Sequence, residues 1–394
     1  MIKMIFLNLG HQPLANNYTN KKELSKKKKY ILTVQYQKKN NLISIKKKFK
    51  SKIMFNNKYP YRSSLSKTMR KNFKDLAKNL INKFHPKKIL EIGCNDGVFL
   101  KNFNSQVTVG VEPCKNIADL IKLKKINVHK NYWDLKLANK IKNKHGKFDL
   151  IYSANTITHI KDLDIVFRSI NQVLSEEGIL VIEDPSLLEC IKNVSYDQFY
   201  NEHIYVFSLI SLQKILKKHK LEIFKVENLN VHGGSNRYYI KKSMNKKIRI
   251  NHSVKQNKIK ELKYKLDKFI TYRKFGKNVK ESKRKLKKLI LDIKNKKKSI
   301  IGYGATAKSV TVMNYCGFKS DEINYFVDTT PEKKNKYLPG TNIIVKKYKI
   351  NSLKNIDYVY LGAWNFKNEI LNKERKYIKK GLKFITHVPY PRII

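Results

Sequence analysis

Cysteine is scarce in this sequence of 394 residues, and its placement excludes two common uses. Cys94, Cys114, Cys190 and Cys316 lie far apart and form no C-x-x-C pair. Neither a zinc knuckle nor a disulfide framework is therefore expected. Reduced, unpaired cysteines are typical of a cytoplasmic protein, which is the location that the sequence predicts.

Acidic residues are also few, 30 against 85 basic ones, which gives a formal net charge of +55. Nine of the basic residues are arginines, and the lysines are spread along the whole chain. Nucleic-acid sites concentrate arginine and aromatic residues in one region. The charge therefore predicts a solvated surface and no nucleic-acid partner.

Long apolar runs are missing as well. The apolar start, Met1–Leu9, is shorter than the core of a signal peptide, and no later run reaches the length of a membrane span. We expect neither secretion nor a membrane partner.

The hydrophobic content of 41% is enough for a large core, and the length predicts two or three domains. An amphipathic helix begins near Leu65, and after it strand-like and helical patterns alternate, which is typical of a doubly wound parallel sheet. The expected strands are 88–92, 107–112, 126–128, 148–154, 178–183, 221–230 and 236–241, and the expected helical segments are 98–100, 116–124 and 163–174.

A second alternation starts at Ser299, with strands expected at 300–301, 323–328, 357–362 and 383–388. The predicted class is α/β: a class I, Rossmann-like methyltransferase sheet followed by a second Rossmann-like α/β domain, with a small N-terminal module. The predicted division is 1–58 for the weakly patterned module, 59–245 for the first sheet, 246–298 for a helical connector and 299–394 for the second sheet.

A glycine turn follows the first strand of the larger sheet. Gly93 and Gly97 allow a sharp turn and a close approach to a ligand, and Glu112 ends the next strand, where a carboxylate can accept hydrogen bonds from ribose hydroxyls. The pattern E-x-G-x-x-x-G differs from G-x-G-x-x-G and resembles the first motif of S-adenosylmethionine-dependent methyltransferases. The predicted cofactor-binding residues are Glu91, Gly93, Asn95, Asp96, Gly97, Glu112 and Asn155.

Several acid-base groups gather in the segment 196–203. A histidine held by a carboxylate is a suitable base near neutral pH, so His203 beside Glu202 is the candidate base. A plain ion pair across a loop is the alternative for these two residues. His159 follows the fourth strand, where such sheets form their active-site crevice, although a capping or surface histidine is equally compatible.

Two further glycine-containing segments suggest ligand binding. His232–Arg237 combines glycines with hydrogen-bond donors, and a hairpin turn is the alternative. Gly302–Lys308 has the form G-x-G-x-x-A, with Asp328 ending the next strand, which favours a second nucleotide.

These motifs occur in the same order as in a known family. The chain resembles the sugar C-methyltransferases of deoxysugar biosynthesis, which have an N-terminal zinc module, a methyltransferase domain and a Rossmann-like C-terminal domain. The resemblance implies that Tyr61, His159, Tyr200, Glu202 and His203 line the catalytic cleft, with His203 as general base. The matching blocks are Leu9–Asn16, Tyr59–Ser64, 91–97, Tyr200–His203, His232–Ser235, Gly302–Lys308 and Ala363–Phe366.

One feature departs from that family. The four zinc-binding cysteines of the N-terminal module are missing, and the second pair is replaced near Tyr36 and Lys39. We therefore expect no structural metal and no zinc. Because metal binding supplies folding free energy to such modules, residues 1–58 are expected to be remodelled or loose.

The function expected from the resemblance is methyl transfer from S-adenosylmethionine to carbon of a nucleotide-linked keto-deoxysugar. Methyl transfer changes no redox state, so the C-terminal glycine turn is expected to hold the nucleotide-sugar and no nicotinamide. Oxygen methylation, nucleic-acid methylation and a catalytically silent binding protein are the alternatives. We expect a monomer or weak oligomer. The predicted substrate-binding residues are His232, Gly233, Gly234, Ser235, Arg237, Gly302, Tyr303, Gly304 and Lys308.

Overall fold

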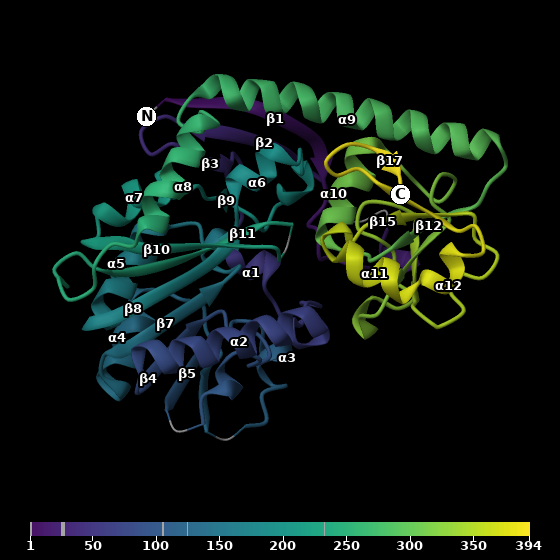
Figure 1. Ribbon diagram of the computed structural model, residues 1–394. Coiled ribbons are helices and arrows are strands. Elements are labelled where there is room, and N and C mark those ends of the chain that lie inside the picture. The colour runs from purple at the N-terminus through teal and green to yellow at the C-terminus, as the bar shows by residue number, and fades with distance from the viewer. Residues whose placement is uncertain (1, 25–27, 105, 124, 232) are drawn as a thin grey trace.

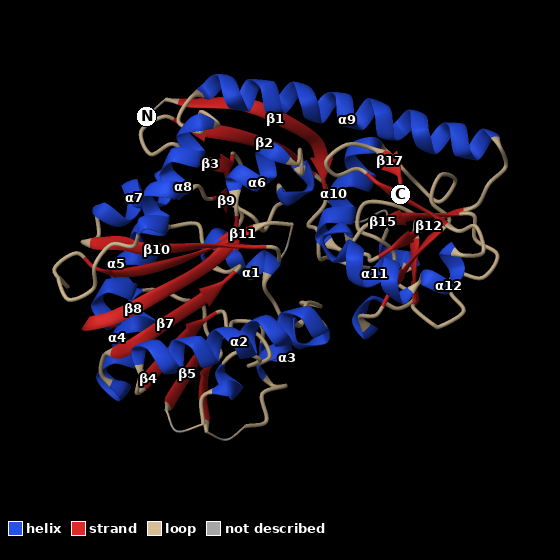
Figure 2. Cartoon of the chain, in the orientation of Figure 1, coloured by secondary structure: helices blue, strands red, loops and turns tan. Residues whose placement is uncertain are grey.

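The computed structural model describes residues 2–24, 28–104, 106–123, 125–231 and 233–394. Strands in this part of the chain form three sheets, and Figures 1 and 2 show helices packed around the two larger ones. These two are mostly parallel, so the predicted α/β class with two Rossmann-like sheets is confirmed. None of the described helices is long and apolar enough to cross a membrane.

The N-terminal sheet has the order β1-β2-β3-β9 and is antiparallel. Leu7, Leu9, Leu32 and Val34 are buried in its core. The module that we expected to be remodelled or loose is therefore an ordered sheet. Its strands are β1 (Lys3–Gln12), β2 (Tyr30–Gln37), β3 (Leu42–Ile45) and the distant β9 (Tyr205–Val206).

The middle sheet has the order β10-β11-β8-β7-β4-β5-β6, in which β11 is antiparallel to both of its neighbours. All seven of its strands were expected near their observed positions. They are β4 (Lys88–Ile92), β5 (Val107–Val111), β6 (Ile126–His129), β7 (Phe148–Ala154), β8 (Leu174–Pro185), β10 (Leu221–Leu229) and β11 (Ser235–Lys242).

The helices around the middle sheet differ more from the sequence prediction. The helix expected at 116–124 is the single turn α3 (Lys115–Ala118), the segment 98–100 leads into a 3-10 turn at Leu100–Asn102, and helix α4 (Leu135–His145) was not expected. The remaining helices of this part are α1 (Ser51–Met54), α2 (Lys67–Phe84), α5 (Leu163–Val173), α6 (Leu187–Lys192) and α7 (Leu209–Lys217).

The C-terminal sheet has the order β14-β13-β12-β15-β16-β17, and β17 is antiparallel to β16. Its strands are β12 (Ile300–Tyr303), β13 (Tyr325–Asp328), β14 (Ile344–Lys347), β15 (Tyr358–Leu361), β16 (Lys383–Thr386) and β17 (Arg392–Ile393). Its helices are α10 (Ala307–Cys316), α11 (Lys367–Lys373) and α12 (Arg375–Ile378).

Two helices, α8 (His252–Lys263) and α9 (Phe269–Asn295), connect the larger sheets within the segment 246–298, where the sequence predicts helices. In Figure 1 the long α9 runs from β1 toward the C-terminal sheet. It approaches β1 so closely that a Cβ atom on Gly276 would lie 2.2 Å from the carbonyl oxygen of Phe6. The division at 58, 245 and 298 stays a prediction, because β9 joins the first two parts.

Candidate functional site

A cavity of about 600 Å³ lies where the three parts of the chain meet. The carboxyl ends of β4, β5 and β7 open on it from the middle sheet, and those of β12 and β13 open on it from the C-terminal sheet. Asn16 reaches it from the N-terminal module. Open α/β sheets bind ligands at the carboxyl ends of their strands, so this cavity is the candidate active site.

The turn after β4 follows the form that the sequence predicts. Gly93 has a φ of 79°, and a Cβ atom there would lie 2.1 Å from Oγ1 of Thr156, so the position requires glycine. Gly97 also has a positive φ, of 73°. The turn thereby brings backbone to the cavity without a side chain in the way.

The carboxylate of Glu112 lies beside this turn. It accepts hydrogen bonds from the backbone N–H groups of Asn95 (3.0 Å) and Cys114 (2.8 Å). Burial raises the pKa of Glu112, although these two bonds act in the opposite direction. These hydrogen bonds fix Glu112 in the cavity wall.

Two buried polar atoms in the same wall fit a nucleoside. Oε2 of Glu91 and Nε1 of Trp133 are buried without a hydrogen-bond partner among the described residues. Both residues line the cavity, together with Asn155, Val111 and Tyr132. Unpaired acceptors and donors beside an apolar wall suit an adenosine group, so the residues present fit S-adenosylmethionine.

Asn95 and Asp96 hold the chain segment that contains Tyr61. Asn95 accepts from the N–H of Ser63 (2.8 Å) and donates to the carbonyl of Tyr61 (3.2 Å), and Asp96 accepts from the N–H of Ser64 (3.2 Å). Of the predicted cofactor residues, Glu91, Gly93, Asn95, Glu112 and Asn155 line the cavity. Asp96 and Gly97 belong to the same turn but do not line the cavity.

His203 belongs to the loop between α6 and β9, and the hydrogen bonds of its ring fix its tautomer. Nδ1 lies 2.8 Å from the carbonyl oxygen of Gln198, and Nε2 lies 2.5 Å from the hydroxyl of Tyr200. A carbonyl only accepts, so Nδ1 holds the proton and Nε2 accepts from Tyr200. Nε2 is therefore the basic atom.

His159 stacks on His203, with ring centroids 5.2 Å apart, and on Phe55, with ring centroids 5.1 Å apart. Burial lowers its pKa to about 3, so the ring is neutral at physiological pH. Its buried Nε2 has no hydrogen-bond partner among the described residues. His159 can therefore donate or accept a hydrogen bond toward a ligand.

Glu202 is buried and does not make the contact that we expected of it. Both carboxylate oxygens accept from the amide of Asn16, at 2.8 and 2.9 Å, and Oε2 also accepts from the hydroxyl of Tyr59 (3.3 Å). The hydrogen bonds that orient the ring of His203 come instead from Gln198 and Tyr200. Burial raises the pKa of Glu202 to about 7, although the bonds from Asn16 and Tyr59 lower it.

The opposite wall comes from the glycine turn after β12. A Cβ atom on Gly302 would lie 2.3 Å from the ring of Phe326, and one on Gly304 would lie 2.6 Å from Cβ of Ala363. Asp328 accepts from the N–H of Ala305 (2.8 Å) and lies 3.3 Å from Nζ of Lys333. Close packing thus explains why Gly302 and Gly304 are glycines, and Asp328 forms an ion pair with Lys333.

Tyr303, Gly304 and Lys308 line the cavity as predicted, whereas Gly302 does not contact it. Lys308 is buried, and its Nζ lies 4.9 Å from the ring centroid of Trp364. Burial lowers the pKa of Lys308, although Asp197 acts in the opposite direction.

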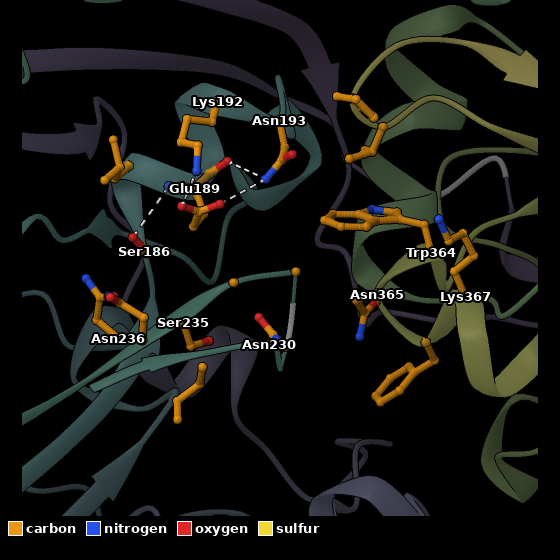
Figure 3. A pocket seen from close by; sticks show the side chains of 18 of the residues that line it. Ser186, Glu189, Lys192, Asn193, Asn230, Ser235, Asn236, Trp364, Asn365 and Lys367 are labelled. Atoms are coloured by element: carbon orange, nitrogen blue, oxygen red, sulfur yellow. Dashed lines mark hydrogen bonds and ion pairs between the residues drawn. The ribbon is translucent and has the colours of Figure 1, made fainter. Parts of the chain in front are cut away.

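The segment after β10 faces a second cavity, of about 810 Å³, which Figure 3 shows. Gly233, Gly234 and Ser235 line it, opposite Trp364 and Asn365. The segment is a hairpin connection, and a Cβ atom on Gly233 would lie 2.2 Å from the indole of Trp364. Gly233 therefore permits a close contact between the two larger parts of the chain, whereas Gly234 packs against Glu189. His232 lies outside the described residues.

Arg237 is separate from both cavities. It is buried and pairs with Glu183 (2.9 Å) and Glu227 (3.0 Å). These contacts favour a structural ion-pair network within the middle sheet. A substrate-binding role for Arg237, which we predicted from its neighbours in the sequence, has no support in this geometry.

Sequence reasoning did not single out Asp197, which links the two larger sheets. Its carboxylate accepts from Nε1 of Trp364 (2.6 Å) and lies 3.3 Å from Nε2 of His387. Burial raises the pKa of Asp197, but His387 and Lys308 outweigh it and lower the value. The available signal for Asp197 was its position only five residues before Glu202. Trp133 was also not singled out, and its signal was its position just after β6.

Comparison with known proteins gives matches to two family models and one curated relative. A methyltransferase domain model matches residues 61–226, and a C-methyltransferase C-terminal domain model matches residues 230–389. The C-methyltransferase NovU of Streptomyces niveus is 28% identical over 308 residues, which cover 78% of this chain and 73% of NovU.

Solved structures also show similarity, over smaller parts of the chain. An S-adenosylmethionine-dependent methyltransferase of Clostridium acetobutylicum is 16% identical, with a TM-score of 0.34, over 44% of this chain and 91% of that protein. An O-methyltransferase from a Brevibacillus brevis multienzyme, in complex with S-adenosyl-L-homocysteine, is 14% identical, with a TM-score of 0.35, over 50% of this chain and 78% of that protein.

Proposed function

Because this chain belongs to the S-adenosylmethionine-dependent C-methyltransferases, we propose that its acceptor is a nucleotide-linked keto-deoxysugar, methylated at the carbon beside the ketone. The observation that supports this is the pair of His203 and Tyr200. Nε2 of His203 is unprotonated and lies in the cavity that the cofactor turn also lines. Methylation of a carbon next to a ketone requires such a base, because the C–H bond must first lose its proton.

The cofactor site comprises the turn at Gly93, the carboxyl groups of Glu91 and Glu112, and the side chain of Trp133. When bound, the cofactor supplies a methyl group that is activated by its attachment to a sulfonium sulfur. Glu112 would accept hydrogen bonds from the ribose, and Nε1 of Trp133 would donate to the base. These contacts would hold the methyl donor at the edge of the middle sheet.

The proton leaves the substrate through Tyr200 and His203. The hydroxyl of Tyr200 passes its own proton to Nε2 of His203 while it takes the proton of the substrate carbon. Burial raises the pKa of Tyr200 well above its usual value, so this transfer is concerted and leaves no free tyrosinate. The remaining enolate carbon would form the new bond to the methyl carbon while the methyl–sulfur bond breaks, so that the sulfonium would leave as the neutral thioether S-adenosylhomocysteine.

Negative charge on the enolate oxygen and positive charge on His203 both need stabilisation. Nε2 of His159 donates to the oxygen as a neutral imidazole, and Tyr61 adds a second donor from the same cavity. The carboxylate of Glu202, next to His203 in the chain, favours the imidazolium that forms.

The C-terminal wall binds the nucleotide diphosphate. The first turn of α10 supplies the positive end of a helix, and Lys308 adds a cation. Asp328 is paired with Lys333 and is therefore a poor acceptor for the ribose of a dinucleotide. A nicotinamide cofactor consequently has no role at this turn.

The central test combines a substrate screen with a His203 variant. Keto-sugar nucleotides are incubated with labelled S-adenosylmethionine, and product is followed by mass spectrometry. His203→Asn should lower kcat by about 10³-fold and leave the cofactor Kd within about twofold, because the ring receives the substrate proton through Tyr200 and does not belong to the cofactor turn. Exposed His252→Asn is the matched control, and wild-type turnover of His203→Asn overturns the assignment.

Oxygen methylation is the second candidate, because a histidine base serves a hydroxyl equally well. Exchange of the α-carbon proton separates the two reactions. In D₂O, with S-adenosylhomocysteine in place of the methyl donor, a carbon methyltransferase incorporates deuterium into the keto-sugar, and an oxygen methyltransferase does not.

We also propose that the N-terminal module needs no zinc. The side chain of Tyr36, near the replaced cysteines, bonds to Asn41 (2.9 Å) and to the carbonyl of Asp267 (2.7 Å), and its ring stacks on Tyr272 with centroids 5.0 Å apart. These contacts attach β2 to α9 and its preceding loop. Chelator treatment should therefore leave both Tm and activity unchanged, and a fall in either disproves this proposal.

A further inference from the structure

The segment Gln12–Tyr18 of the N-terminal module touches both larger parts of the chain beside the candidate active site. Nε2 of Gln12 donates to the carbonyl of Thr311 in α10 (3.3 Å), and the hydroxyl of Tyr18 donates to the carbonyl of Ala305 (2.5 Å). The carbonyl of Pro13 accepts from the amide of Asn201 (2.7 Å). The segment is thus fixed on both sides of the cavity.

Asn16 lies in the middle of this segment and lines the cavity. Its amide nitrogen donates to both oxygens of Glu202, at 2.8 and 2.9 Å. One nitrogen is therefore shared by both oxygens, and hydrogen bonds donated to a carboxylate favour its ionised form. Tyr59 adds one longer bond, of 3.3 Å, so Asn16 is the principal described donor to Glu202.

The surroundings of Glu202 otherwise favour the neutral acid. The side chain is buried, and the titratable groups that interact with it electrostatically are Tyr18, Tyr59, Tyr200 and Cys114. All four are neutral near pH 7, since burial raises the pKa of each. His203 follows directly in the chain and forms the base pair with Tyr200.

We propose that Asn16 is a positioning residue of the active site, which orients the Glu202 carboxylate and keeps it ionised so that it can stabilise the imidazolium of His203. The N-terminal module then contributes directly to catalysis through one amide. This inference rests on the proposed function only for its kinetic test, because the charge state of Glu202 can be measured without a substrate.

The substrate-free test uses the pH dependence of Tm. A buried acid whose folded pKa is raised gives stability that is full below its unfolded pKa and is lost as the pH rises through the folded pKa. The difference in Tm between wild type and Glu202→Gln should therefore change across about pH 5 to 8, around the folded pKa of about 7. In an Asn16→Leu background, the pH at the midpoint of this change in the Tm difference should rise by about one unit or more.

The matched control is Asn17→Leu, at an exposed position, which should leave the midpoint pH of the Tm difference unchanged. Asn16→Ala is the second variant, in case leucine prevents folding. A midpoint that stays within about 0.3 pH units in both Asn16 variants overturns the proposal. Because no acceptor is present, this result is independent of what the enzyme methylates.

The kinetic test then asks whether the charge matters for turnover. In Asn16→Leu the acidic limb of the kcat profile should move up in pH, and kcat above about pH 9 should recover to within about threefold of wild type, since Glu202 ionises there again. A purely structural role predicts a loss that is the same at every pH. A midpoint shift in Tm without any kinetic shift leaves Glu202 positioned by Asn16 but excludes it from the chemistry, which contradicts the second half of the proposal.

Discussion

The two Rossmann-like sheets place the same local arrangement on opposite sides of one cavity. In the middle sheet the N–H of Asn95, in the turn after β4, donates to Glu112, and in the C-terminal sheet the N–H of Ala305, after β12, donates to Asp328. Each acid also accepts from a second backbone N–H, that of Cys114 for Glu112 and that of Thr330 for Asp328. The acids differ in that Asp328 additionally pairs with Lys333.

The titratable residues that line the two walls also differ in kind. Glu91 and Glu112 lie around the middle turn, whereas Lys308, Lys333 and Lys373 line the C-terminal side together with Asp328 and Glu369. A sulfonium cofactor is cationic and a nucleotide diphosphate is anionic. One fold motif used twice can therefore hold ligands of opposite charge against each other, and each prediction below tests one wall while the other serves as control.

The largest expected contrast concerns the two acids. Glu112→Gln removes a ribose acceptor and should raise the S-adenosylmethionine Kd by about 100-fold, since it loses a charged hydrogen bond. Asp328→Asn should leave that Kd within about twofold and lower Tm, because Lys333 loses its partner. Calorimetric titration of both variants checks this, and equal losses of affinity would mean that the turns are equivalent.

Lys308 provides the next contrast. Lys308→Met keeps the length of the side chain and removes the cation, so thymidine diphosphate should bind about 30-fold more weakly, while the cofactor Kd stays unchanged. Exposed Lys334→Met is the control for general charge. Tight nicotinamide dinucleotide binding by wild type, without any response to thymidine diphosphate, is the opposite outcome.

The two tryptophans of the chain give a smaller effect, because Trp133 lines the candidate active site whereas Trp364 lines the second cavity. Trp133→Phe removes the unpartnered Nε1 donor and should weaken cofactor binding by about fivefold. Trp364→Phe instead removes the bond to Asp197, so it should lower Tm and spare the cofactor. Fluorescence titration and thermal unfolding of both variants distinguish the roles.

The smallest effect is expected from the surface lysines. Lys277, Lys280 and Lys288 are exposed on α9, outside both walls of the cavity. Their joint replacement by glutamine should change the free energy of unfolding by less than about 0.5 kcal/mol per site. The affinities for the cofactor and for the nucleotide should both stay unchanged. A clear loss of nucleotide affinity here would show that charge acts over the whole surface and not at one wall.

The sequence predicts what local patterns encode. The strands around Gly93 and Gly304 were placed because apolar runs and glycine turns are continuous in the chain. Strand β9 was not found, since its two residues become a strand only by pairing with Ile43 and Ser44, far away in the sequence. Helix α4 was missed because its buried residues are few among lysines.

The same limit applies to the candidate site. His203 stands out as a residue type that can act as a base, and the structure places it in the cavity. Its orienting partner is the backbone carbonyl of Gln198, which has no residue-specific signal. Asn16 is equally hidden, because its contact with Glu202 joins residues 186 positions apart. The roles assigned to these residues stay predictions.

The hydrogen bond of Gln12 connects two segments that are synthesised at very different times. Its bond to Thr311 joins positions 299 residues apart, so a ribosome that adds about 5 to 20 residues per second needs roughly 15 to 60 s to supply the partner. Until then the segment with Asn16 has only one of its two anchoring surfaces. The enzyme should therefore gain activity only after the C-terminal sheet has emerged, and nascent chains halted before α10 should remain inactive however well their middle sheet has folded.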